Sequence, residues 1–348
     1  MPPNAAPGFW PVDGLQPVSQ CPLCGGSERE LVHKDLTDRL DLDDPGGWAL
    51  YRCARCRSGY LDPMPTPETL GLAYREYYTH STSAPATVGL MATLRLSVTN
   101  GYRNLRFGSK DRPGLRVLGA LVPRLLPAWA MTIDWECRNL PKPKPGMRLL
   151  DVGAGSGEFL DFARRCGWNV VGVDLDEKAV AAGRSRGLDV RNGTIEAIGE
   201  DERFDAITMG HVIEHVYDPH ALLEACYKRL KPGGWIWVDT PNIDSLGHTE
   251  YGPYWIGVDA PRHLILFTPD SLSDALAKAG FVNQEPIHAK LIATFTWAAS
   301  AAVAAGRGVN VDDEFRVAVK QRAMDAVDRE TADPGIREFL TVRAYKPA

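Results

Sequence analysis

The chain has 348 residues and a formal net charge of −5, with 44% hydrophobic and 24% charged residues. This length leaves room for two domains, and the apolar fraction is ordinary for a globular protein with a buried core. The mildly acidic balance gives no chain-wide electrostatic footprint for nucleic acid, so we expect no DNA partner and do not favour RNA. The N-terminus has no apolar leader segment, and no run reaches the roughly 18 apolar residues of a membrane span. We therefore expect a cytoplasmic protein.

Two C-x-x-C pairs stand near the N-terminus: Cys21 with Cys24, and Cys53 with Cys56. In a cytoplasmic protein, paired cysteines indicate metal binding rather than a disulfide. Each pair can form a tight turn that presents two thiolates to one ion, and two pairs complete a tetrahedral zinc site. Such a site is structural, because no position remains open for water or substrate. We predict one Zn²⁺ in a zinc-ribbon-like module over 1–80; four free thiols or a redox pair is the alternative.

A helical and basic segment follows this module. A short helix is expected over 68–78, and helical patterning continues through 81–145. Between positions 95 and 124 this segment carries seven lysines or arginines and a single acid, Asp111. It is either a solvated helical face or a lid whose cations meet a phosphate-bearing substrate, such as a nucleotide sugar or a lipid-linked glycan.

A glycine motif begins the last predicted domain. The Pro-Lys-Pro-Lys-Pro run at 141–145 is a stiff linker, so this domain is placed at 146–348. Residues 147–160 read Met-Arg-Leu-Leu-Asp-Val-Gly-Ala-Gly-Ser-Gly-Glu-Phe-Leu. The apolar run that ends at Asp151 indicates a buried parallel strand. Glycines directly after such a strand let the chain turn sharply and let its backbone approach a ligand, which in open α/β sheets binds at this edge.

The glycine spacing and a later acid narrow the kind of ligand. In the dinucleotide fingerprint the third glycine comes one residue later, where this chain has Glu158. A second buried strand over 170–174 closes with Asp174, whose carboxylate suits the two hydroxyls of a ribose. The pattern predicts a nucleotide-type site, with an ordinary strand-to-helix turn as the alternative.

Strands and helices alternate through the rest of the chain. Expected helices cover 158–165, 177–186, 219–230 and 269–280, and further strands cover 188–191, 204–209, 235–239, 281–290 and 336–346. This alternation indicates an α/β fold with a doubly wound, mostly parallel sheet of seven strands, the last of them antiparallel. The Ala-rich helical segment 293–331 is expected to cover the substrate mouth or an oligomer face, in a monomer or a homodimer.

Further motifs indicate which protein family the chain resembles. The run from Phe204-Asp to Glu214-His215-Val-x-Asp218-Pro219, followed by Leu230-Lys-Pro-Gly-Gly234, resembles class I S-adenosylmethionine (SAM) methyltransferases over roughly 146–347. With its four-cysteine module, the whole chain resembles bacterial methyltransferases of sugar, polysaccharide and natural-product assembly. The nearest mechanistic relatives are zinc-containing deoxysugar C-methyltransferases, whose further C-terminal domain is not expected here.

This resemblance implies a SAM site, with S-adenosylhomocysteine as the product. Its contacts are expected at the carboxyl ends of the first four parallel strands. The implied cofactor-binding residues are Asp151, Gly153, Ala154, Gly155, Gly157, Asp174, Leu175, Thr194, Ile195, Gly210 and His211.

A general base is needed if the acceptor is a hydroxyl. His215 is our first choice, because it follows the fourth strand and an imidazole titrates near neutrality. Glu214 would orient that imidazole, and a structural role for the Glu-His pair is the alternative. The run from His211 to His215 also matches the H-x-x-E-H pattern of zinc peptidases, but Asp218-Pro219 ends it before a long helix can form.

The long loop over 240–267 supplies the second candidate base, His263. Long loops in compact domains are usually functional. Its aromatic residues are expected to stack on the acceptor or close over the sulfonium. A packed loop with a hydrogen-bonded histidine is the alternative. The expected acceptor-binding residues are Tyr251, Tyr254, Trp255 and Arg262.

Taken together, these features predict an O-methyltransferase that acts on a sugar hydroxyl in glycan or natural-product biosynthesis. C-methylation of a nucleotide-linked keto-sugar and methylation of another small molecule are the next hypotheses. RNA methylation, with the four-cysteine module gripping RNA, belongs to a different class and is opposed by the acidic balance. A non-catalytic SAM-binding protein is the remaining alternative.

Overall fold

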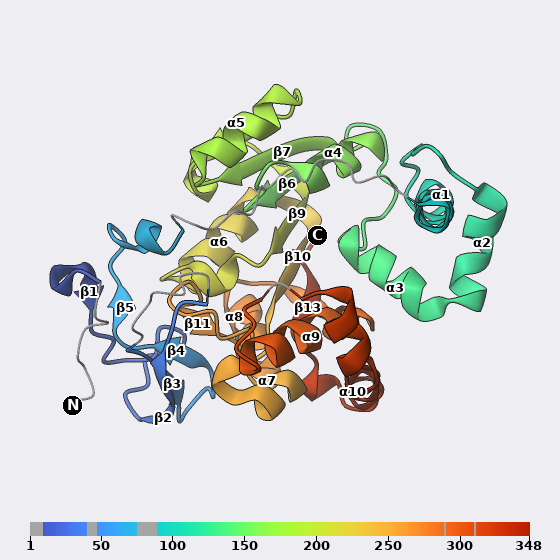
Figure 1. Cartoon of the computed structure of the whole chain (residues 1–348). Coiled ribbons are helices and arrows are strands. Elements are labelled where there is room, and N and C mark those ends of the chain that lie inside the picture. The colour runs from blue at the N-terminus through green and yellow to red at the C-terminus, as the bar shows by residue number, and fades with distance from the viewer. Residues whose placement is uncertain (1–9, 40–46, 75–88, 289, 310) are drawn as a thin grey trace.

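A seven-stranded sheet lies at the centre of the computed structural model, which describes residues 10–39, 47–74, 89–288, 290–309 and 311–348 (Figure 1). Its strand order is β12-β13-β10-β9-β6-β7-β8. All neighbours from β10 to β8 are parallel, and β13 runs antiparallel between β10 and β12. The strands are β6 Arg148–Val152, β7 Asn169–Asp174, β8 Val190–Asn192, β9 Phe204–Gly210, β10 Leu230–Pro241, β12 Val282–Ile287 and β13 Phe339–Tyr345. The predicted doubly wound, mostly parallel sheet is confirmed.

Helices cover both faces of this sheet. They are α4 Glu158–Arg165, α5 Glu177–Ser185, α6 Pro219–Arg229 and α8 Pro269–Lys278. Neighbouring residues of β6 point into different apolar layers: Leu149 packs with residues of α4 and α5, and Leu150 belongs to the layer that contains residues of α6 and α8. This two-sided burial explains why β6 reads as a continuous apolar run. The Asp218 side chain caps α6 by accepting from the Ala221 backbone N–H at 2.9 Å.

The cysteine module forms a second sheet that also includes residues from the C-terminal half of the chain. Its strand order is β11-β4-β3-β2, where β11 follows the long loop. The strands are β2 Arg29–Leu36, β3 Trp48–Cys53, β4 Gly59–Leu61 and β11 Ile265–Leu266, and a separate pair joins β1 Leu15–Gln16 to β5 Met64–Pro65. Trp48 and Tyr60 of the module belong to the same apolar cluster as Leu264 and Phe267. The cysteine module and the sheet domain therefore share one core.

Three helices stand at the opposite end of the molecule from this module (Figure 1). They are α1 Leu90–Arg106, α2 Arg116–Leu125 and α3 Pro127–Glu136. Residues 81–88 of the predicted helical segment, and 75–78 of the short helix before it, lie outside the described residues. Among the described residues no single helix is both long and apolar enough to cross a bilayer; α2 and α3 reach that composition only as a pair, with a bend of 111° between them.

The remaining elements are helices and 3₁₀ turns. The loop over 240–267 is largely structured, because it contains a helix, a 3₁₀ turn and the strand β11. The helices are α7 Leu246–Tyr251, α9 Ile292–Ala304 and α10 Asp313–Ala332, and the 3₁₀ turns are η1 Val12–Gly14, η2 Leu70–Tyr74, η3 Ile195–Ala197, η4 Ile213–His215, η5 Gly252–Tyr254 and η6 Pro334–Ile336.

Candidate active site at the carboxyl edge of the sheet

The glycine loop between β6 and α4 adopts a backbone that other residues rarely take. Gly153, Gly155 and Gly157 have φ angles of +72°, +54° and +80°. A Cβ atom on Gly153 would overlap the Val212 side chain, and one on Gly157 would overlap Leu188. Both the left-handed backbone and the close approach therefore require glycine.

The Asp174 carboxylate at the end of β7 closes this loop. It accepts from the Gly155 backbone N–H at 2.7 Å and from the Asp176 N–H at 2.9 Å. Leu175 beside it is 72% exposed and offers an apolar surface at the sheet edge. The two predicted cofactor residues that follow β8 differ in exposure: Ile195 is buried, whereas Thr194 is exposed. Ala154 is buried.

Arg138 is a residue of this edge that sequence reasoning missed. It lies just after α3, pairs with the buried carboxylate of Asp151, and donates to Thr208 Oγ1 at 3.0 Å. Its guanidinium also lies 4.0 Å from the centre of the Phe159 ring. Burial raises the pKa of Asp151 to about 6, although Arg138 and Thr208 oppose this rise. The other oxygen of Asp151, Oδ2, is buried without a hydrogen-bond partner.

His211 lies between two buried carboxylates at the end of β9, next to the predicted cofactor residue Gly210. Its Nδ1 is 3.3 Å from Glu214 Oε1, and its Nε2 is 3.3 Å from Asp239 Oδ2. Desolvation disfavours the imidazolium, but the hydrogen bond to Glu214 and the charge of Asp239 prevail and raise the pKa of His211. The side chain is 44% exposed, so it faces both solvent and these carboxylates. Asp239 is the second residue that sequence reasoning left out of the site.

His215 and His263, the two predicted bases, are brought together. Their ring centres are 4.7 Å apart. The backbone carbonyl of Arg262 lies 2.9 Å from His215 Nδ1, and because a carbonyl only accepts, Nδ1 carries the proton and Nε2 keeps its lone pair. Burial and the neighbouring His263 lower the pKa of His215 to about 4. His215 is therefore neutral near pH 7.

Glu214 lies beneath this pair with no exposed surface. It accepts from Thr240 Oγ1 at 2.9 Å. Burial works against its ionisation, but the hydrogen bond from His211 and the charge of His215 lower the pKa of Glu214 to about 2. One potential ligand atom from each of Glu214, His215 and His263 lies within 4.8 Å of the other two. The three residues thus form one compact polar cluster.

Arg262, predicted to bind the acceptor, is instead fully buried between two carboxylates. It donates to both oxygens of Asp38, at 2.8 and 2.6 Å, and to Asp259 Oδ1 at 2.8 Å. Asp38 belongs to the cysteine module, so this bidentate pair joins the module to the loop that carries His263. The side chain of Arg262 acts as a link between these parts and has no surface to offer an acceptor.

The predicted aromatic residues also differ in exposure. Trp255 is 1% exposed and donates from Nε1 to Glu338 Oε2 at 2.7 Å. Tyr251 is 9% exposed and stacks edge-on against Trp297. Tyr254 is 50% exposed. Of these three side chains, only Tyr254 is available to stack on a bound molecule.

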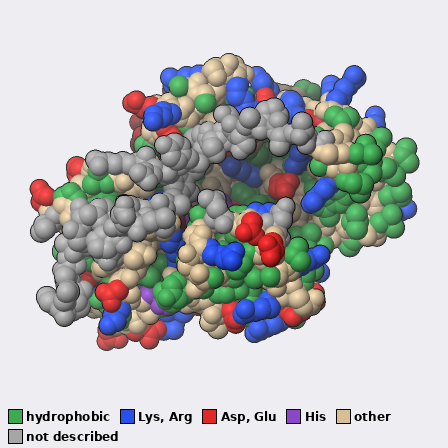
Figure 2. Space-filling model, in the orientation of Figure 1, with side chains coloured by type: hydrophobic (Ala, Val, Ile, Leu, Met, Phe, Trp, Pro, Cys, Tyr) green, Lys and Arg blue, Asp and Glu red, His purple; other side chains and the backbone are tan. Residues whose placement is uncertain are grey.

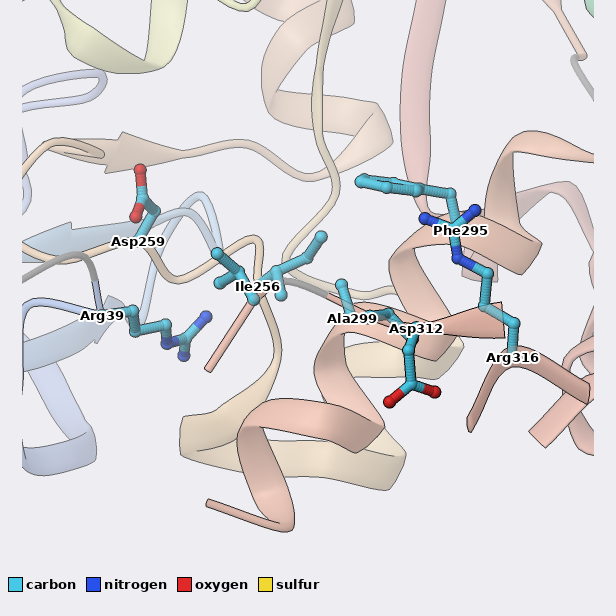
Figure 3. A pocket seen from close by; sticks show the side chains of 9 residues that line it. Arg39, Ile256, Asp259, Phe295, Ala299, Asp312 and Arg316 are labelled. Carbon is cyan, nitrogen blue, oxygen red and sulfur yellow. The ribbon is translucent and has the colours of Figure 1, made fainter. Parts of the chain in front are cut away.

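A cavity of about 530 Å³ opens beside Asp259 (Figure 3). Its wall includes Asp259, whose Oδ2 lies 3.9 Å from His263 Nε2. The lining is mostly apolar, with a cation on either side, Arg39 and Arg316. The lining residues are Arg39, Ile256, Asp259, Phe295, Ala299, Val309, Val311, Asp312 and Arg316. Its volume suits a small organic ligand.

The four cysteines converge at the end of the module. Cys21 Sγ is 3.5 Å from Cys56 Sγ, and Cys24 Sγ is 3.4 Å from Cys53 Sγ. All four sulfur atoms lie within 4.8 Å of one another. Four sulfurs at about 2.3 Å from a tetrahedral zinc would be about 3.8 Å apart, so the arrangement fits such an ion.

Comparisons with known proteins show similarity to methyltransferases. Residues 132–285 match the family model described as "Methyltransferase domain". The ubiquinone biosynthesis O-methyltransferase of Chelativorans sp. (strain BNC1) is 35% identical over 157 residues, covering 41% of this chain and 62% of that protein. Its namesake from Dinoroseobacter shibae is 34% identical over 168 residues, covering 44% and 66%.

The match covers less than two thirds of the length of these relatives. Their name refers to ubiquinone biosynthesis, whereas the sequence led us to expect sugar methyltransferases. Among solved structures, Haemonchus contortus phosphoethanolamine N-methyltransferase 2 is 18% identical with a TM-score of 0.45, over 83% of this chain and 63% of that one.

Proposed function

We propose that this chain, which carries a class I SAM-dependent methyltransferase domain, transfers a methyl group from SAM to a hydroxyl oxygen of a small molecule. The observation that carries the proposal is the closure of the glycine loop on Asp174, inside the residues that match the methyltransferase family. Transfer to oxygen is supported by the O-methyltransferase name of the relatives.

The residues present fit SAM. The glycine loop turns sharply at the end of β6 through three residues with positive φ, and Asp174 beside it can accept from ribose hydroxyls. The orphaned Oδ2 of Asp151 is a buried acceptor that lacks a donor. Leu175 would contact the adenine ring through its exposed side chain. SAM, when bound, supplies an electrophilic methyl group on its sulfonium.

We assign the general base to His215. Its Nδ1–H is fixed by the Arg262 carbonyl, so Nε2 is left to accept the acceptor's proton. The carboxylate of Glu214 would stabilise the imidazolium that forms. The rival is His211, whose contact with Asp239 also gives an oriented, carboxylate-supported imidazole.

The acceptor is proposed to enter the cavity beside Asp259. Its apolar wall suits a hydrocarbon or aromatic part, and Arg39 and Arg316 suit a carboxylate or phosphate. The same wall carries the carboxylates Asp259 and Asp312, which suit a hydroxyl donor. A phenolic acid has all three features. A nucleotide sugar, the acceptor class expected from the sequence, would use the cations but has only Tyr254 left for stacking.

Methyl-labelled SAM and two acceptor probes test this function. We expect the purified chain to bind SAM and to place label on an oxygen of 3,4-dihydroxybenzoate or, failing that, of UDP-glucose. Product analysis by mass spectrometry identifies the methylated atom. Label on carbon or nitrogen would contradict O-methylation, and a chain that binds no SAM would contradict the whole proposal.

The pH profile distinguishes the two candidate bases. A base works in its neutral form, so activity falls as the pH drops through its pKa. With His215 as base, kcat/KM should hold from pH 8 down to about 5, because its pKa is about 4. With His211 as base, the fall would begin above the ordinary imidazole value of about 6.5, because its pKa is raised.

Variants complete this test. His215→Gln should lower kcat by about 10² to 10⁴ while SAM affinity stays unchanged. His220→Gln, on α6, is the control, since its Nε2 hydrogen-bonds the Leu23 carbonyl at 2.8 Å and it lies outside the cluster of Glu214, His215 and His263. If kcat/KM of the parent chain instead falls as the pH drops from a point above 6.5, and this fall is absent in His211→Gln, the general base is His211.

A further inference from the structure

The outer surface of α1 and α2 is unusually apolar for a protein surface. Ten large hydrophobic side chains in or beside these helices are exposed, among them Leu90 at 85%, Met91 at 75% and Val117 at 80%. Single exposed apolar residues are common, but a contiguous group marks an interaction site. Figure 2 shows hydrophobic side chains gathered at this end of the molecule. The α1–α2 face consists of Leu90, Met91, Leu94, Leu96, Leu115, Val117, Leu118, Leu121, Leu125 and Leu126.

The way in which the two helices pack explains why these leucines point outward. A Cβ atom on Gly101 would overlap the backbone of Leu115, and one on Gly119 would overlap the backbone of Gly101 and Tyr102. The helices therefore touch through glycines, and the Asn100 side chain donates to the Pro113 carbonyl at 2.9 Å. Small and polar residues fill the contact, so the large apolar side chains are left on the outside.

Cations border the same face. Positions 95–124 hold seven lysines or arginines against one acid, in a chain whose net charge is −5. Two of the cations, Arg103 and Arg106, pair with carboxylates of α3. The other five are exposed, and in the part of the chain that the structure describes none forms an ion pair: Arg95, Lys110, Arg112, Arg116 and Arg124. Positive charge is thus concentrated around an apolar surface.

This combination selects one kind of occupant. A second copy of the chain would cover the leucines but would bring two sets of unpaired cations together. An anionic lipid bilayer covers the apolar side chains with its acyl boundary and meets the cations with its headgroups. We propose that the α1–α2 face docks this protein on the surface of an anionic membrane. The docking does not depend on which acceptor is methylated.

Vesicle flotation with the full chain tests the proposal. The chain should bind vesicles of phosphatidylcholine mixed with phosphatidylglycerol, bind phosphatidylcholine alone weakly, and be released by high salt. Val117→Asp should lower the bound fraction about tenfold, because a carboxylate then faces the anionic surface. The matched control is Val317→Asp on α10, since Val317 is 71% exposed and lies outside the face. The control should bind as the parent chain does.

Two measurements keep the outcome unambiguous. Unchanged SAM affinity in both variants shows that they are folded. Equal binding by Val117→Asp and Val317→Asp, or no preference for the anionic vesicles, would overturn the proposal. Light scattering that shows a dimer of the parent chain, lost only in Val117→Asp, would assign the face to self-association instead.

Discussion

Gly153→Ala is expected to weaken SAM binding by about 10- to 100-fold, which corresponds to about 1.4 to 2.8 kcal/mol. The alanine Cβ would overlap Val212, the residue after His211, so the glycine loop and the end of β9 would have to separate. Both segments belong to the proposed cofactor edge. Titration calorimetry with SAM measures the effect directly.

Gly187→Ala is the matched control for this variant. Gly187 has the same φ of +72°, but a Cβ there would only touch the tip of Arg164, at 3.9 Å. Both variants should lose about 1 to 2 kcal/mol of stability from the left-handed backbone. Only Gly153→Ala should also lose SAM affinity. Equal affinities for SAM in the two variants would show that the loop does not hold the cofactor.

Cys53→Ser is expected to remove the zinc and destabilise the whole chain. The parent should contain about one zinc ion and the variant about none. A tetrahedral zinc site loses most of its affinity for the metal when one of its four thiolates is removed. Elemental analysis gives the metal content, and thermal unfolding gives the stability. The loss of thermal stability should extend to the sheet domain, since the module shares a core with it.

Cys166→Ser provides the control, because Cys166 is partly exposed at the end of α4 and lies outside the four-cysteine cluster. It should keep both zinc and stability. A parent chain without zinc after purification would contradict the site. Zinc that persists at about one ion in Cys53→Ser, with stability unchanged, would contradict the role of this cysteine as a ligand.

Local signals in the sequence were enough to predict the central sheet. Strands such as β6 are continuous apolar runs because both faces are covered, and α6 begins where Asp218 and Pro219 cap it. The glycine loop was visible for the same reason, since its backbone permits few other residues. These features depend on neighbours in the sequence.

The parts that could not be predicted depend on distant contacts. β11 is two residues long and is a strand only because it pairs with β4. Arg138 reaches Asp151 from a segment before the linker, and the buried Trp255 donates its N–H to Glu338 on a distant segment. Nothing in the residues around Trp255 distinguishes a ring that stacks on a ligand from one packed in the core.

The buried arginine at position 262 constrains how this chain can change over time. Its guanidinium depends on Asp38 and Asp259, which are separated by more than half of the sequence. Losing either carboxylate leaves a positive charge partly unpaired in the interior. We therefore expect a chimaera with a foreign N-terminal module to stay stable only if the position of Asp38 keeps a carboxylate for Arg262.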